Sequence, residues 1–401
     1  MVFSNLKKIR FSFYLLLLVV INGCSVWDSF TTYFNLYYNT IESFEKAEEQ
    51  IYAQQRSLFS TQPLTIPGTA NTELEKVIEK CSNILQFHSE TGYVEDALLM
   101  LGKSFYYQNN YQKAQRKFEE LIASQVEGDY ELEAELWIGK CQMKLKHYSD
   151  ALSTLHNVRQ VAIEEDEELI VQEAFIEEII YRVTTEDYSS AIALANEFME
   201  VSDDDEIKAE VWYGIGNLNV RIGDIQNAIL AYKNVFEYSP GFDLETDAKL
   251  KYGQALRDGE QSETALSVFE DMRSEDKYEN KLAEIDFEIG KTYASLERYN
   301  DAIDKLIDVD TTYRNTESAG AAKYEIGLVY EAGLKQLDSA AIYYKKAATS
   351  TLSGDYLIAS KEKNQLFTRY VNLRSNLNNY GKQFFYYEHP NEFVKDSTRY
   401  V

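Results

Sequence analysis

The chain has 401 residues, and its 66 acidic against 40 basic side chains give a net charge of −26 at pH 7. A chain this acidic does not attract nucleic acid or anionic lipid through its overall field, so no nucleic-acid partner is expected. Four prolines and 31 tyrosines are typical of a long helical array with aromatic packing between its helices.

The first 23 residues have the pattern of a secretory signal. A basic start at Lys7, Lys8 and Arg10 precedes an apolar run over residues 11–21, which is too short to span a bilayer comfortably. Removal of residues 1–23 would leave 37 basic against 66 acidic side chains, a net charge of −29.

The apolar run ends on Ile21-Asn22-Gly23-Cys24, which resembles the signal of bacterial lipoproteins. The resemblance implies that Cys24 is acylated and becomes the mature N-terminus. Ser25, where an Asp would signal retention in the inner membrane, implies the outer membrane. We expect the anchored protein on its periplasmic face. An ordinary signal with an incidental cysteine is the alternative. Acyl chains anchor durably, because each buried CH₂ contributes ~0.8 kcal/mol.

Residues 24–70 are expected to form an amphipathic helix close to the anchor, followed by a loop rich in proline and glycine. The helix either caps the first repeat or places Trp27, Phe30 and Tyr33 in the membrane interface. Thr72 with Glu75 three residues later is a capping box, which predicts that the next helix begins after Thr72.

Residues 71–354 repeat. Glycines recur at intervals of 37 residues within two runs, namely Gly102 and Gly139, then Gly216, Gly253, Gly290 and Gly327. Alanines keep step at Ala114, Ala151, Ala191, Ala228, Ala265, Ala302 and Ala340. A large residue follows most of them four places on, at Phe118, Leu155, Tyr232, Phe269, Leu306 and Tyr344. Small residues let two antiparallel helices approach closely, so we expect seven helix-turn-helix units, with Gly290 facing Ala302 in the sixth.

Two units depart from this pattern. The third has Ile179 in place of its glycine and Ala195 in place of its large residue. The seventh has one extra residue before Asp338.

Residues 209–240 contain Trp212, Ile215-Gly216, Ala228, Tyr232, Val235 and Pro240 at spacings that resemble the tetratricopeptide repeat. The resemblance implies an all-α fold, a right-handed superhelix (α-solenoid) of about seven repeats closed by capping helices. Residues 355–401 would supply a C-terminal capping helix. The aromatic tail Phe384–Tyr387 beyond it either folds back onto the last repeat or marks a docking site.

The stretch Tyr93–Leu98, which leads into Leu101-Gly102, resembles the tetratricopeptide lipoproteins of the cell envelope. Two relatives share this resemblance, which does not decide between them: the lipoprotein subunit of the outer-membrane β-barrel assembly machinery (BamD-like) and the periplasmic repeat protein that works with the Tol-Pal system. The resemblance implies a non-catalytic scaffold for protein–protein interaction that serves envelope assembly, secretion or outer-membrane protein complexes.

The sequence contains no recognisable catalytic motif. Its four histidines lack zinc-binding spacing, and no glycine-rich phosphate loop or nucleophile elbow occurs, so no catalytic residue, metal ligand or cofactor is predicted. Acid runs at 164–168 and 203–206 are interpreted as solvated segments, and Cys81 and Cys141 as core thiols. A glutamate-based enzyme acting on peptidoglycan and a structural spacer remain alternatives to the scaffold.

The resemblance also implies that the first helix of each repeat lines a concave groove. The residues just after the glycines, and those three places before them, are the candidate partner-binding residues: Lys103, Lys140, Tyr213, Asn217, Gln254, Phe287, Lys291 and Tyr324. They predict aromatic platforms beside Lys and amide groups, suited to an extended peptide or helix with acidic and apolar residues. Alternatively, these side chains pack between adjacent first helices.

The anchor has a direct test. Cys24→Ser should prevent acylation and move the protein from the membrane to the soluble fraction, because the acyl chains supply the membrane affinity. Fractionation of cells followed by immunoblotting measures the change. Unaltered membrane partition of the variant would contradict the lipoprotein hypothesis.

Overall fold

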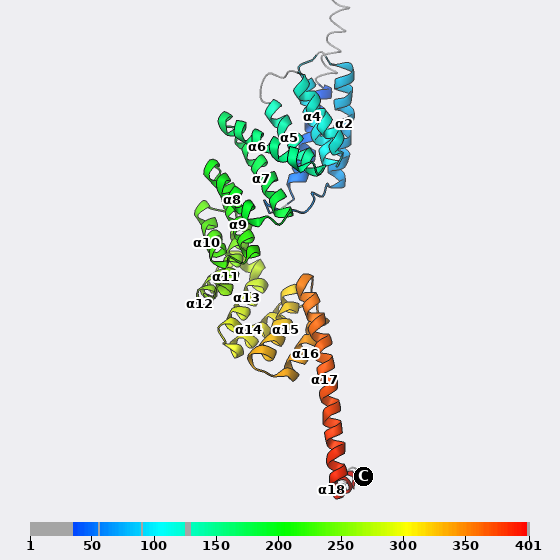
Figure 1. The fold of residues 1–401 in the computed structure, drawn as a ribbon, viewed down its shortest axis with the longest axis vertical. Coiled ribbons are helices and arrows are strands. Elements are labelled where there is room, and N and C mark those ends of the chain that lie inside the picture. Colours follow the sequence, from blue (N-terminus) through cyan, green and yellow to red (C-terminus); the bar gives the residue numbers. More distant parts are fainter. Residues whose placement is uncertain (1–34, 55–56, 90, 125–129, 399–401) are drawn as a thin grey trace, which may run out of the picture. The chain divides into compact units, whose positions relative to one another are not determined.

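The computed structural model describes residues 35–54, 57–89, 91–124 and 130–398, which form helices and connecting turns without any strand. The predicted all-α helical-repeat solenoid is confirmed (Figure 1). The signal, Cys24 and the aromatic residues Trp27, Phe30 and Tyr33 lie outside the described residues.

Seven antiparallel hairpins follow one another along the described chain, as the repeats predict. They are α3 (Val94–Tyr107) with α4 (Tyr111–Ala123), α5 (Tyr130–Lys144) with α6 (Tyr148–Glu165), α7 (Glu168–Thr184) with α8 (Tyr188–Val201), α9 (Asp205–Ile222) with α10 (Ile225–Val235), α11 (Phe242–Asp258) with α12 (Ser262–Ser274), α13 (Leu282–Ser295) with α14 (Tyr299–Thr312), and α15 (Glu317–Leu328) with α16 (Leu337–Ala348). Short helices η1 (Phe236–Tyr238) and η2 (Asp276–Lys281) lie between hairpins.

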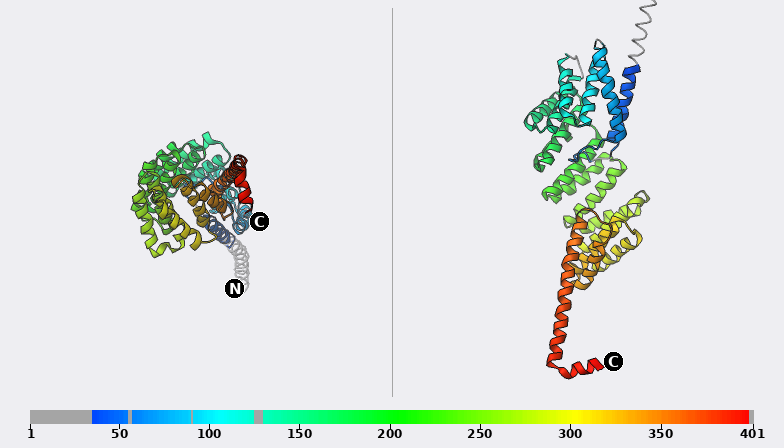
Figure 2. Two further views of the ribbon diagram at one scale, coloured as in Figure 1. Left: turned by 90° about the horizontal axis from the view of Figure 1, so that it is seen from below. Right: turned by 90° about the vertical axis from the view of Figure 1, so that its right-hand side faces the viewer.

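Further helices flank the hairpins at both ends. Residues 35–52 form a helix that precedes α2 (Gly68–Phe87). After the seventh hairpin come the 35-residue α17 (Gly354–Glu388) and the short α18 (Pro390–Thr398). Figure 2 shows α17 continuing well past α16, with α18 turned away at its end.

The chain divides into two compact units, Met1–Gly214 and Ile215–Val401, with the boundary inside α9. Within each unit, successive first helices contact one another, as α5 contacts α7 and α13 contacts α15, whereas contacts between successive second helices are sparse. The first helices therefore lie on the inside of the stack. We call the surface that they form in each unit its first-helix face.

Six of the seven described hairpins are closed by a glycine that lies against a large side chain. A Cβ atom placed on the glycines of six hairpins would come within 2.4–2.8 Å of Phe118, Leu155, Tyr232, Phe269, Leu306 or Tyr344 of the second helix. The expected contact between Gly290 and Ala302 is corrected by this geometry, because Leu306 is the nearest residue to Gly290. The alanine remains fully buried one turn earlier.

The third hairpin keeps its packing with the two sizes exchanged. Ile179 on the first helix and Ala195 on the second are both fully buried, so the bulk has moved from α8 to α7. Phe175 and Phe198 stack beside them with ring centroids 5.0 Å apart. Total core volume can thus be preserved although the repeat signature is lost.

The turn inside every hairpin holds one residue in the left-handed region, at Asn109, Lys146, Glu186, Gly223, Glu260, Glu297 and Lys335. Only one of these is glycine, which is the residue that such a conformation favours. In the seventh hairpin the extra residue is accommodated by a π-helical turn, η3 (Val329–Gly333).

Two local predictions are decided by the structure. Thr72 is not a helix cap, since α2 begins at Gly68 directly after Pro67, and the Thr72 hydroxyl donates to the Gly68 carbonyl within the helix. Cys81 and Cys141 are buried free thiols, as predicted. Burial raises the pKa of each thiol to about 12, so both behave as core residues.

The capping helix is longer than expected and does not fold back. Its first half packs on α16 through buried Ser360 and Phe367, and the Phe367 ring lies 4.9 Å from that of Tyr344. Phe384 and Tyr387 of the aromatic tail are 62% and 85% exposed at the far end of the same helix. Fold-back onto the last repeat is therefore wrong.

Gly290→Ala should destabilise the second unit by about 1–3 kcal/mol, because the new methyl group overpacks a closed contact. Its Cβ would lie 2.7 Å from Cγ and Cδ2 of Leu306. Thermal unfolding followed by circular dichroism, with hydrogen exchange of α13 and α14, measures the loss.

The matched control is Gly381→Ala in α17, where no atom lies within 4 Å of the added Cβ. This change should increase local amide protection, because Ala favours a helix interior over Gly by roughly 0.5–1 kcal/mol. If both variants changed stability by the same amount and sign, close packing at Gly290 would be refuted.

Candidate functional site: the first-helix faces

Successive first helices of the first unit are joined by ion pairs. Lys103 on α3 reaches Glu133 on α5 with Nζ and Oε1 2.6 Å apart. Lys140 on α5 reaches Glu173 on α7 at 2.9 Å, and the next turn repeats the arrangement between Lys144 and Glu177 at 3.4 Å. The face therefore presents lysines whose charge is already matched by the neighbouring repeat.

Trp137 is the aromatic centre of this first-unit face. The Nζ atoms of Lys103 and Lys140 lie 5.3 and 4.1 Å from its ring centroid, which are cation–π distances. Burial acts to lower the pKa of Lys140, but Glu173 and Glu177 outweigh it, so the pKa is raised and the side chain stays charged. The cluster therefore combines a buried aromatic ring with matched charges.

A non-helical segment that precedes α2 packs on the first unit. Residues 57–67 are non-helical, and Phe59 is 6% exposed although it belongs to a loop. Its ring fits against Gly214 of α9, where an added Cβ would come within 2.4 Å of the ring. Leu64 and Ile66 pack on the hydrophobic core that contains α2 and α3 residues.

The position of Gly214 tells which side of α9 the Phe59 ring contacts. Gly216, two residues further on, faces Tyr232 of the hairpin's second helix. Side chains two places apart on a helix point to nearly opposite sides. Phe59 therefore contacts the first-helix face of the first unit, and Gly214 is the residue that admits it.

The first-helix face of the second unit is organised around Glu288 on α13, which is 4% exposed. Arg257 and Gln254 of α11 both donate to it, at 2.5 and 3.0 Å. One helix further, Tyr356 of α17 donates to Glu325 of α15 at 2.7 Å. Burial raises the pKa of Glu325, and the carboxylate of Glu288 adds to this, against the lowering effect of Lys291, Tyr356 and Arg257.

The eight predicted partner-binding residues lie on first helices. Most of them make hydrogen bonds, ion pairs or ring contacts with other residues of the same chain. Asn217 accepts from Tyr232, Phe287 is 6% exposed, Lys291 approaches Glu288 at 3.7 Å, and Tyr324 packs against Tyr344 and Tyr356. Tyr213 is half-buried on α9. These contacts are those of the alternative in which the side chains pack between adjacent first helices. Binding of a partner through them stays a prediction.

The prediction missed the carboxylates that complete the face. Glu133, Glu173 and Glu288 follow their basic or amide partners by 30 to 34 residues, close to one repeat. That offset is a signal present in the sequence. Phe59 had no such signal, because its contact with Gly214 joins positions far apart in the chain.

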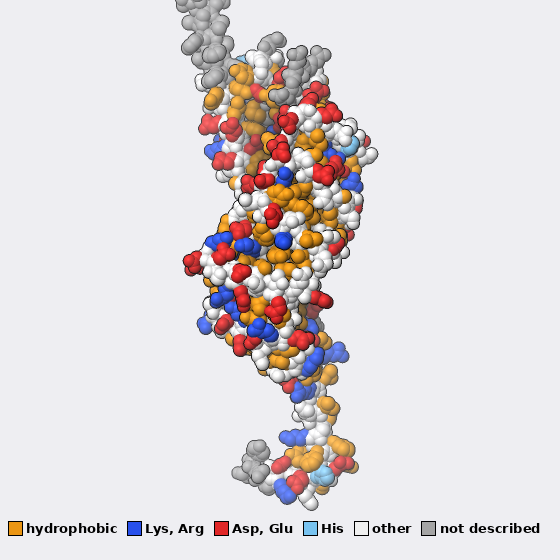
Figure 3. Space-filling view, turned by 90° about the vertical axis from the view of Figure 1, so that its left-hand side faces the viewer, with side chains coloured by type: hydrophobic (Ala, Val, Ile, Leu, Met, Phe, Trp, Pro, Cys, Tyr) orange, Lys and Arg blue, Asp and Glu red, His pale blue; other side chains and the backbone are white. Residues whose placement is uncertain are grey.

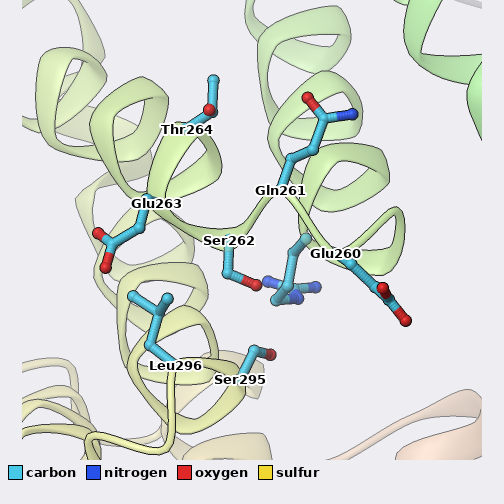
Figure 4. A pocket seen from close by; sticks show the side chains of 8 residues that line it. Glu260, Gln261, Ser262, Glu263, Thr264, Ser295 and Leu296 are labelled. Atoms are coloured by element: carbon cyan, nitrogen blue, oxygen red, sulfur yellow. The ribbon is translucent and has the colours of Figure 1, made fainter.

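A small surface pocket of about 400 Å³ lies in the second unit, between the α11–α12 turn and the C-terminal end of α13. Figure 4 shows Ser262 and Ser295 on its walls, with Glu260 and Glu263 directed away from one another. Arg257 at this pocket is already bound to Glu288. The lining offers neither a nucleophile with a base nor an extended apolar surface.

Among the described residues, no three His, Cys, Asp or Glu side chains come together as metal ligands. Within the same part of the chain, none of the helices combines the length and the apolar character that crossing a membrane requires.

Comparison with known proteins agrees with the repeat architecture. Residues 17–168 match the family model described as a tetratricopeptide repeat-like domain. No curated protein matches this chain. The array of paired helices and the family match together define a helical-repeat class. The chain is thus a helical-repeat protein, and its residues 17–168 are similar to the tetratricopeptide repeat-like domain family.

Solved structures with similar folds come from diverse proteins. A tetratricopeptide repeat protein from Parabacteroides merdae is 13% identical, with 69% of this chain and 100% of that chain covered and a TM-score of 0.43. The apo form of RapI is 15% identical, with 69% of this chain and 82% of that chain covered and a TM-score of 0.46. YrrB, described as having an unusual peptide-binding site, is 20% identical. The match covers 51% of this chain and 97% of YrrB, with a TM-score of 0.35.

Glu325→Gln should stabilise the second unit at pH 7. Because the folded-state pKa of Glu325 is raised, ionisation costs folding free energy at pH values above it, and no cost remains below the unfolded-state pKa of roughly 4.3. Gln keeps an acceptor for Tyr356. A gain of about 1 kcal/mol would raise the unfolding midpoint by about 2–4 °C.

Thermal unfolding between pH 3.5 and 7.5 measures this difference, which should vanish at the acid end. Glu279→Gln, at an exposed position of η2, is the control and should give curves that follow wild type throughout. A stabilisation by Glu325→Gln that persisted unchanged at the acid end would contradict the assigned cause.

Proposed function

We propose that this protein is a non-catalytic scaffold that holds extended segments of other proteins on its first-helix faces. Tetratricopeptide repeat proteins generally mediate protein–protein interaction, and the family is typically non-catalytic. The basic and apolar residues before Cys24 support a lipid anchor on the periplasmic face of the outer membrane, with a role in envelope assembly, secretion or outer-membrane complexes.

One observation carries the proposal. The first-helix face of the first unit already holds a non-helical segment, and Phe59, in a turn of that segment closed by the Ser60 N–H donating to the Ser57 carbonyl, fits over a helix glycine. A partner segment with an aromatic or aliphatic anchor has the same chemistry as residues 57–66. Such anchors supply most of the binding energy in peptide grooves.

The charged residues of the face have a different role in this proposal. Lys103 and Lys140 already form ion pairs with carboxylates of the next repeat. Breaking one such half-buried pair leaves the other charge unmatched, which is costly. The ion pairs therefore help to hold successive first helices together, and apolar anchors recognise the partner.

The alternatives are a peptidoglycan-acting enzyme and a spacer. A glycosidase needs two carboxyl groups flanking a cleft, one of them protonated. Glu325 has a raised pKa, but its neighbour Glu288 is held by Arg257 and Gln254 rather than directed at a cleft. A glycan-release assay with purified peptidoglycan tests whether the protein is such an enzyme. Binding of a peptide to the first-helix face, described next, would argue against a pure spacer.

A synthetic peptide with the sequence of residues 57–66 should bind the full-length Phe59→Ala protein. In wild type the chain's own segment competes at an effective concentration in the millimolar range, so binding should be much weaker. Fluorescence anisotropy of the labelled peptide measures both affinities. The first-helix face is thereby tested with a defined ligand.

Two controls isolate the anchor. The same peptide with Phe59 replaced by Ala should bind at least about tenfold more weakly, which corresponds to 1.4 kcal/mol. Adding Gly214→Ala to the Phe59→Ala protein should also abolish binding, since the Cβ fills the space of the ring. Equal binding of both peptides, or of both proteins, would exclude this site.

A further inference from the structure

The second half of α17 carries a regular apolar seam. Its residues alternate three and four places apart, at Tyr370, Leu373, Leu377, Tyr380, Phe384 and Tyr387. This is the a/d spacing of a two-stranded coiled coil, in which one stripe of a helix meets the same stripe of another. The seam spans more than two heptads inside a single helix.

The seam is open to solvent in the described chain. Leu373, Leu377, Tyr380, Phe384 and Tyr387 are between 59% and 85% exposed. Figure 3 shows hydrophobic side chains gathered around the far end of α17 and on α18. Contiguous exposed apolar surface on this scale marks an interaction site.

The neighbouring helices cover only the first residue of the seam, the half-buried Tyr370, which packs against Phe367, and leave the rest of the seam uncovered. α16 covers the start of the helix through Ser360 and Phe367. α18 packs on the opposite side from the seam, where the Tyr386 ring lies 5.4 Å from Phe393 and its hydroxyl donates to Asp396 at 2.8 Å. Residue 386 falls at the outer c position of the heptad.

This half of α17 has little stability of its own. Residues 371–388 include four asparagines and Gly381, which are poor helix formers. An isolated helix of this length is marginal in water even with good helix formers. A helix that long and that weak needs a partner along its seam.

We propose that the seam binds the same seam of a second copy, so that two chains pair through an antiparallel coiled coil of α17. A second copy supplies a matching heptad stripe. Residues 371–398 are electrically neutral within a strongly acidic chain, since Arg374, Lys382 and Lys395 balance Glu388, Glu392 and Asp396, so two such segments do not repel.

The flanking charges select the antiparallel orientation. In a parallel pair, Arg369 at a g position of one helix would face Arg374 at an e position of the other, twice per dimer, and the Asp338 carboxylate that pairs with Arg374 within the chain would offset only part of the repulsion. In the antiparallel pair Leu377 lies opposite Tyr380, Leu373 opposite Phe384 and Tyr370 opposite Tyr387, and the arginines are separated. Six exposed aromatic side chains, three from each copy and each able to bury ~150–250 Å², together with the exposed leucines bring the interface toward the ~1,200–2,000 Å² of specific complexes.

Sedimentation equilibrium of the full-length chain tests the pairing. Wild type at micromolar concentration should have twice the chain mass of 46.3 kDa. Leu377→Arg with Phe384→Arg, which places charges on the seam, should be monomeric while the circular dichroism of the repeats is kept. The matched control, Ser375→Arg with Asn379→Arg on the outer face of α17, should remain dimeric.

Cysteine cross-linking tests the orientation in a Cys24→Ser background. Oxidation of a mixture of Leu373→Cys and Phe384→Cys chains should give the mixed disulfide dimer, and neither variant alone should cross-link. Self-linked dimers of each variant would show a parallel pair and overturn the orientation. A monomeric wild type, or a seam variant that stays dimeric, would overturn the proposal. Monomers that bind phosphatidylcholine vesicles through the seam would instead assign it to a membrane.

Discussion

The contact between a first-helix glycine and a large second-helix side chain is the constraint on which the rest of the structure depends. In six hairpins it lets the two helix backbones approach closely at the same repeat position. The aromatic ring or leucine side chain of the second helix occupies the space that a Cβ atom on the first helix would need. Because this contact sets the distance between the two helices of a hairpin, the first helices of successive hairpins lie side by side, and their other sides form a continuous surface. The first-helix faces are a consequence of that packing.

Much of the fold follows from the sequence because this contact repeats in it. Glycine and alanine at a constant period identify the hairpins, and they fail only where the sizes exchange at Ile179 and Ala195. The turns were less predictable. Lys146 and Glu260 adopt the left-handed conformation without being glycine, since tight hairpin geometry overrides local preference. Likewise, the extra residue before Asp338 indicated an irregularity but not a π-helical turn.

The candidate site was harder to predict because its partners come from neighbouring repeats. Lys140 after its glycine has the composition of a binding residue, and only the position of Glu173 one repeat later shows that its charge is matched. Phe59 and Gly214 are further apart still, on a loop and on the fourth hairpin. Periodicity describes a repeat and its neighbours, whereas contacts of non-repeating segments require the assembled structure.

The molecule has two kinds of surface, the charged first-helix faces and the apolar residues outside the repeats. Charged residues on the first-helix faces are matched within the chain, so their mutual attraction stabilises the stack instead of a complex. Apolar residues outside the repeats, such as Phe59 and the seam of α17, have no periodic partner to satisfy them. Phe59 is buried by a glycine of the array, whereas Leu377 and Phe384 have no such glycine beside them. Apolar surface thus remains uncovered where the repeat pattern ends, as along the seam of α17.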